Sequence, residues 1–79
     1  MITETQYTQL KQYDRPLMTA YRAKYAHIAP NDLRHVLEIY YGPTWNKQVP
    51  KSVFSCGKCK LNELTKIGKD YYDYEQTTN

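Results

Sequence analysis

The segment CGKCKLNELTKIGKDYYDY, residues 56–74, carries its apolar side chains at the intervals of an α-helix. They recur every three or four positions, at Leu61, Leu64, Ile67 and Tyr71. Gly68 lies in the same stripe, where the lack of a side chain lets another helix approach closely. We therefore predict a long C-terminal helix over about residues 56–74, followed by a frayed tail at residues 75–79.

A second amphipathic stripe lies at the other end of the chain. Its apolar positions are Tyr7, Leu10, Tyr13, Leu17, Tyr21, Tyr25 and Ile28. Thr3 and Gln6 have the spacing of a capping box, which marks a helix start. Pro16 would remove a backbone hydrogen bond inside this helix, whereas Asp14 can cap a restart just before it. We predict a first helix that is broken or kinked near residues 13–15.

The middle of the chain predicts one more helix and a packed loop. Pro30 ends the first helix and Asn31 is a good N-cap, so the second helix should run from there to about Tyr41. Its inner face would consist of Leu33, Val36, Leu37 and Tyr40. Gly42 is a strong C-terminal signal. Residues 43–55 hold apolar side chains without a clean period, which indicates a packed loop.

These patterns predict an all-α, three-helix fold that forms a single domain over residues 1–79. At this length one core leaves only about 3–5 kcal/mol of stability, so support from a metal, a partner or a second copy is expected. No apolar run approaches the roughly 20 residues that span a bilayer, and the N-terminus does not resemble a signal peptide. We expect no membrane association and a cytoplasmic location.

Tyrosine dominates the aromatic residues, with nine Tyr against one Trp and one Phe. A tyrosine ring favours apolar contact while its hydroxyl favours water or a polar partner, so the residue is common at half-buried positions and at interfaces. The chain should therefore bind a protein partner or a second copy of itself through a Tyr-rich surface. Candidate anchors are Tyr40, Tyr41, Trp45, Tyr71, Tyr72 and Tyr74.

The pair Cys56 and Cys59 opens the predicted C-terminal helix. On an ideal helix Cys56 lies beside the apolar stripe and Cys59 points toward the basic, solvent-facing side. A zinc site would need His27 and His35 as its other ligands, unless four cysteines from two chains share the ion. A redox role would use the helix N-terminus, but no strand precedes the pair as in thioredoxin-like proteins. We favour two unmodified thiols and no bound cofactor, with zinc as the alternative.

The net charge of the whole chain is +3, and its positive charge is uneven, because residues 47–69 hold six lysines against one acidic residue, Glu63. The predicted C-terminal helix bears a basic ridge, defined by Lys58, Lys60, Lys66 and Lys69. Such a ridge permits salt-dependent binding of nucleic acid, although readout of base edges generally relies on Arg, Asn or Gln. Three glycines and two histidines build neither a phosphate loop nor a catalytic triad, so we expect no enzymatic activity.

The residues Leu37-Glu38-Ile39-Tyr40-Tyr41-Gly42, Cys56-Gly57-Lys58-Cys59, Leu64-Thr65-Lys66-Ile67-Gly68-Lys69 and Tyr71-Tyr72 resemble small uncharacterised accessory proteins of tailed bacteriophages of Bacteroidetes. The resemblance covers about residues 33–72. It implies a phage-encoded virion-assembly factor found in the host cytoplasm or the virion, and it supplies no site residue. We predict a non-enzymatic protein-interaction or assembly protein. The alternative is a small basic nucleic-acid-binding protein, with or without a structural zinc.

Overall fold

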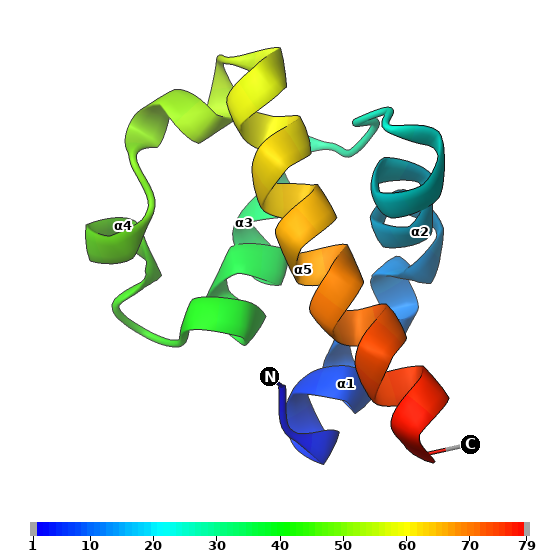
Figure 1. Ribbon diagram of the computed structural model, residues 1–79. Helices are drawn as coiled ribbons and strands as arrows, with labels where there is room; N and C mark the ends of the chain where they lie inside the picture. Colours follow the sequence, from blue (N-terminus) through cyan, green and yellow to red (C-terminus); the bar gives the residue numbers. More distant parts are fainter. Residues whose placement is uncertain (1, 79) are drawn as a thin grey trace.

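The computed structural model describes residues 2–78, and within that range the chain is helical, with no strand. The elements are α1 (Glu4–Leu10), the 3₁₀ turn η1 (Lys11–Tyr13), α2 (Asp14–Ala23), α3 (Pro30–Tyr41), α4 (Trp45–Gln48), the 3₁₀ turn η2 (Lys51–Phe54) and α5 (Gly57–Thr78). In Figure 1, α5 crosses the molecule between α2 and α3. The predicted all-α fold with a long C-terminal helix is confirmed.

The N-terminal helix begins and breaks where the sequence predicts. The Thr3 N–H donates to Gln6 Oε1 at 2.8 Å and the Gln6 N–H donates to Thr3 Oγ1 at 3.2 Å, which completes the capping box. After α1 the chain tightens into η1, and α2 begins at Asp14. Pro16 lies in the first turn of α2, where a missing N–H removes no helical hydrogen bond.

The predicted role of Asp14 as the cap of the restarted helix is wrong. The residue at the N-cap is Tyr13, and no side chain caps α2. Asp14 instead accepts a hydrogen bond from the Tyr71 hydroxyl at 2.8 Å. Its carboxylate therefore links α2 to α5. It accepts from a hydroxyl of another helix instead of from a backbone N–H in the first turn of α2.

The first helix also ends earlier than its apolar stripe suggests. Lys24 adopts a left-handed backbone conformation with φ of 58°, which ends α2 at Ala23. Residues 25–29 lie outside a helix. Tyr25, which the stripe places on the inner face, is 59% exposed as a result.

The second predicted helix, α3, has a different start from the one expected. Pro30 is its first residue and Ala29 its N-cap, so the prediction of Asn31 as N-cap is wrong. Proline suits the first helical position because its fixed φ is already helical and its missing N–H is not needed there. Gly42 ends α3 as predicted, with a positive φ of 87° that a glycine adopts without strain.

Gln6 connects α1 to the end of α3. Its side-chain amide donates to the carbonyl oxygens of Ile39 and Tyr40, each at 3.1 Å. Carbonyls in the last turn of a helix have no partner within the helix. One side chain thus caps α1 and satisfies two acceptors of α3.

The connection between α3 and α5 is packed, as predicted, but it also contains the one-turn helices α4 and η2. Two residues of this connection, Val49 and Val53, are buried in the core. Elements this short span too few residues to show a helical period in the sequence. At the other end, α5 continues to Thr78, beyond the predicted end at about residue 74. Asn79 lies outside the described residues, and fraying of the tail stays a prediction.

The antiparallel pair α2 and α5 forms the centre of the fold (Figure 1). The Thr65 hydroxyl donates to the Ala20 carbonyl oxygen at 3.3 Å. One turn further along, a Cβ built on Gly68 would lie 2.7 Å from the Leu17 carbonyl oxygen, so the helices meet backbone to backbone. Contacts step by three residues in opposite directions along the two helices: Asp14 with Tyr71, Leu17 with Gly68, and Ala20 with Thr65.

Apolar side chains from α1, α2, α3, η2 and α5 are buried in a single core, and Trp45 of α4 packs against it. Its buried members are Ile2, Leu10, Leu17, Ala20, Leu33, Val36, Leu37, Ile39, Val49, Val53, Leu64, Ile67 and Tyr71. The predicted inner faces of α3 and α5 are largely confirmed, with Tyr40 and Leu61 packed at the edge of the core.

We expect Gly68→Ala to lower the free energy of unfolding by about 1–2 kcal/mol. The added methyl group would collide with the Leu17 carbonyl oxygen, an overpacking cost that exceeds the roughly 1 kcal/mol that alanine gains in helix propensity. Urea unfolding followed by circular dichroism measures the change. Gly57→Ala is the matched control, because a Cβ there meets nothing within 4 Å. A Gly68→Ala protein as stable as the control would contradict the close approach.

Candidate functional site

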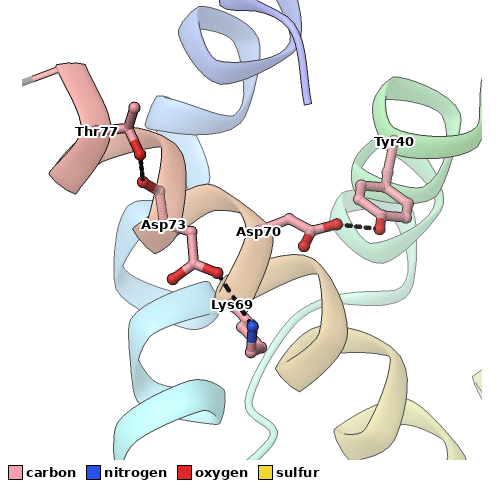
Figure 2. A network of polar contacts seen from close by, with 5 residues as sticks. All are labelled: Tyr40, Lys69, Asp70, Asp73 and Thr77. Atoms are coloured by element: carbon pink, nitrogen blue, oxygen red, sulfur yellow. Dashed lines mark hydrogen bonds and ion pairs between the residues drawn. The ribbon is translucent and has the colours of Figure 1, made fainter. Parts of the chain in front are cut away.

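Two adjacent tyrosines at the end of α3 reach across to α5. The Tyr40 hydroxyl donates to Asp70, and the Tyr41 hydroxyl donates to Glu63 at 2.7 Å. Lys66 Nζ donates to the Tyr41 hydroxyl oxygen at 3.1 Å. We call these five residues the Tyr40–Tyr41 cluster. Figure 2 shows Tyr40 pointing from α3 toward Asp70 of α5.

The cluster follows from the spacing of its residues on the two helices. Glu63, Lys66 and Asp70 are separated by three and four residues, which places them along one face of α5. The two tyrosine rings meet edge to face, with centroids 4.8 Å apart and planes at 85°. Each hydroxyl therefore has its own carboxylate.

Burial and hydrogen bonding both favour the neutral form of these tyrosines. Burial raises the pKa of Tyr40, and its hydrogen bond to Asp70 raises the pKa further. The pKa of Tyr41 is raised in the same way by burial and by Glu63. Lys66 Nζ lies 6.0 Å from the centroid of the first ring and 5.3 Å from that of the second, within cation–π range.

The other predicted anchors make ring contacts of their own, outside the Tyr40–Tyr41 cluster. Trp45 of α4 packs edge to face against Phe54, with ring centroids 6.0 Å apart. Tyr74 packs against Tyr7 at 4.9 Å. Tyr71 is 1% exposed and belongs to the core, and we leave it out of any docking surface.

The remaining predicted anchor, Tyr72, takes part in a cationic-aromatic patch that the sequence did not indicate. Tyr72 packs against Tyr21 of α2, with ring centroids 5.5 Å apart. The Arg22 guanidinium lies 5.2 Å from the Tyr72 ring and Lys24 Nζ lies 5.7 Å from the Tyr21 ring. Residues so distant in sequence meet because of the α2–α5 register. The sequence shows a tyrosine at each of the positions 21 and 72, but no local pattern indicates that the two rings meet.

The predicted basic ridge is interrupted by acidic residues. Lys69 pairs with Asp73 at 3.1 Å, a contact that raises the pKa of Lys69 (Figure 2). Lys66 is held in the Tyr40–Tyr41 cluster. Lys58 is exposed and Lys60 half-buried near the start of α5. Two of the four lysines of the ridge, Lys66 and Lys69, are thus held by side chains of this chain.

The two cysteines meet at the start of α5, contrary to the angular prediction that separated them. Cys56 precedes the helix, and its sulfur accepts the backbone N–H of Cys59 at 3.2 Å in the manner of an N-cap. The two Sγ atoms are 2.6 Å apart, and both residues are half-exposed free thiols. Ideal helix angles fail here because an N-cap residue has a non-helical backbone.

The hydrogen bond between the thiols distinguishes them chemically. Hydrogen bonds from the Cys59 side chain and backbone lower the pKa of Cys56, and Lys58 adds to the effect. The pKa of Cys59 is raised, chiefly because its thiol serves as the donor. Cys56 is therefore the stronger candidate for a thiolate.

The structure does not bring the predicted zinc ligands together. His35 Nδ1 lies 2.6 Å from the Tyr13 hydroxyl, and His27 stacks on Tyr25 with ring centroids 6.1 Å apart. Among residues 2–78, no three His, Cys, Asp or Glu side chains are grouped to hold a metal ion. A four-cysteine site shared between two chains stays a prediction.

No protein-family model matches the chain, and no curated protein or solved structure matches it either. No helix in the described range has the length and apolar character that crossing a membrane requires. Residues 2–78 also enclose no pocket.

The bonded tyrosines predict a loss of stability at alkaline pH. In the folded state the pKa values of three tyrosines are raised above the ordinary value, namely Tyr40, Tyr41 and Tyr71. The unfolded chain releases these protons near pH 10, while the folded chain still keeps them. The free energy of unfolding should therefore be unaffected by these groups below about pH 9 and fall as the pH rises beyond about 10.

Urea unfolding between pH 8 and pH 11.5 measures this fall. Replacing Tyr40 and Tyr41 together by Phe should make the fall clearly smaller, because these two sites no longer titrate. The matched control is Tyr25→Phe, at an exposed ring. Equal pH dependence in the double variant and the control would show that the cluster does not hold its protons.

Proposed function

We propose that the chain is a non-enzymatic protein-interaction protein that docks an acidic protein partner on the Tyr40–Tyr41 cluster. The observation that carries this proposal is that Glu63 and Asp70 hold both tyrosine hydroxyls while both rings stay partly exposed. Tyrosine is enriched at the centres of protein interfaces, where its ring supplies apolar area.

Rigidity makes these rings suitable anchors. A side chain that is ordered only on binding costs roughly 0.5–1.5 kcal/mol of affinity. Tyr40 and Tyr41 are already held by their carboxylates and by each other. Docking on the cluster therefore avoids most of this cost.

Charge supports an acidic partner. The acidic groups of the cluster are engaged by tyrosine hydroxyls, whereas Lys66 is exposed above the rings. The surrounding sequence, residues 47–69, contains Lys47, Lys51, Lys58, Lys60, Lys66 and Lys69 against one acidic residue, Glu63. An excess of positive charge along this stretch of the chain speeds encounter with an acidic partner and disfavours a basic one.

Nucleic acid is the weaker alternative. A phosphate backbone needs a continuous track of cations. On α5, Asp70 and Asp73 interrupt such a track, and Lys69 is paired with Asp73. Following the resemblance to bacteriophage accessory proteins, we further propose a role in virion assembly, in the host cytoplasm or the virion.

Selection from a displayed library of random 16-residue peptides tests the docking proposal. We expect enriched peptides to combine acidic residues with apolar ones. Lys66→Glu should weaken their binding roughly tenfold, or about 1.4 kcal/mol, because it reverses the charge above the rings. Lys58→Glu makes the same charge change outside the cluster and should have less than a twofold effect. Circular dichroism checks that both variants fold.

Two results would contradict this function. One is a set of peptides that bind the two variants equally well. The other is tight binding of a fluorescent 20-nucleotide single strand at low salt that Lys58→Glu weakens as much as Lys66→Glu. The second result would favour the nucleic-acid alternative.

A further inference from the structure

The start of α5 carries two thiols that contact each other and remain accessible. The Sγ atoms of Cys56 and Cys59 are 2.6 Å apart, compared with about 2.0 Å in a disulfide bond. A small movement of one side chain would therefore join them. Both residues are half-exposed, and a Cβ at Gly57 would meet nothing within 4 Å, so there is open space beside the pair.

The surroundings stabilise negative charge on one sulfur more than on the other. The Cys56 sulfur accepts from the Cys59 backbone N–H at 3.2 Å and from the Cys59 thiol. It also lies at the N-terminus of the 22-residue helix α5, whose dipole favours an anion there. The Cys59 thiol is the donor of that hydrogen bond, so negative charge on the Cys59 sulfur is stabilised less. The opposite pKa shifts of the two thiols agree with this difference.

We propose that Cys56 and Cys59 are a reactive dithiol pair that exchanges with low-molecular-weight disulfides, with Cys56 as the nucleophile and Cys59 as the resolving thiol. This thiol chemistry is separate from the docking role of the Tyr40–Tyr41 cluster.

The exchange takes place in two steps. The Cys56 thiolate attacks one sulfur of a disulfide RSSR, which forms a mixed disulfide and releases RS⁻. Cys59 then loses its proton to water and attacks the Cys56 sulfur, which forms the intrachain disulfide and releases the second RS⁻. Two protein thiols are oxidised, and one RSSR is reduced to two thiols after protonation.

The test uses the full chain, first reduced and then equilibrated in glutathione buffers of increasing glutathione disulfide content. Mass spectrometry after alkylation measures the oxidised fraction. We expect a monomer that has lost two hydrogens. Cys59→Ser should instead accumulate a glutathione adduct on Cys56, because nothing resolves it.

Alkylation rates with iodoacetamide distinguish the two thiols. At pH 7, Cys56 in the Cys59→Ser variant should react at least about tenfold faster than Cys59 in the Cys56→Ser variant, since the thiolate is the reacting form. Circular dichroism of both variants checks that α5 still forms.

Several outcomes would overturn the proposal. They are the absence of an intrachain disulfide at any buffer composition, equal alkylation rates, or a faster Cys59. A zinc ion that copurifies and protects both thiols would also overturn it, and would favour a metal site shared between chains.

Discussion

The backbones of α2 and α5 meet at Gly68, where the Leu17 carbonyl oxygen occupies the space that a side chain would need. Such contact sets both the distance and the register of the two helices, because neither helix can slide without bringing a Cβ against the other backbone. In this register Asp14 accepts from Tyr71, and Thr65 reaches the backbone of α2. The cationic-aromatic patch at Tyr21 and Tyr72 results from the same alignment.

Tyrosine performs two tasks in this small domain. A chain of 79 residues buries a smaller fraction of its surface than a larger domain does, so side chains that are apolar along the ring and polar at the tip extend the core toward its edge. Tyr71 lies fully inside, with its hydroxyl bonded to Asp14. Tyr40 and Tyr41 lie at the boundary, where the same kind of bond leaves part of each ring exposed for a partner.

The helix α5 also links the two chemically distinct features of the surface. Its N-terminus holds the cysteine pair, and its middle supplies the carboxylates of the Tyr40–Tyr41 cluster. The pair depends on Cys56 lying just outside the helix, since only there does its sulfur fold back onto the first turn. A position one residue further along would place the two thiols at different angles around the helix axis.

The sequence by itself determined the features that depend on neighbours along the chain: the capping box of Thr3 and Gln6, the break before Pro16, the end of α3 at Gly42 and the apolar face of α5. It also indicated the close approach at Gly68, because a glycine within the apolar stripe of a helix leaves room for the backbone of another helix. Tertiary structure alone decided which hydroxyl meets which carboxylate and that Asp14 bonds to α5. It also decided that the two histidines lie apart from the cysteines, because these outcomes depend on helix register.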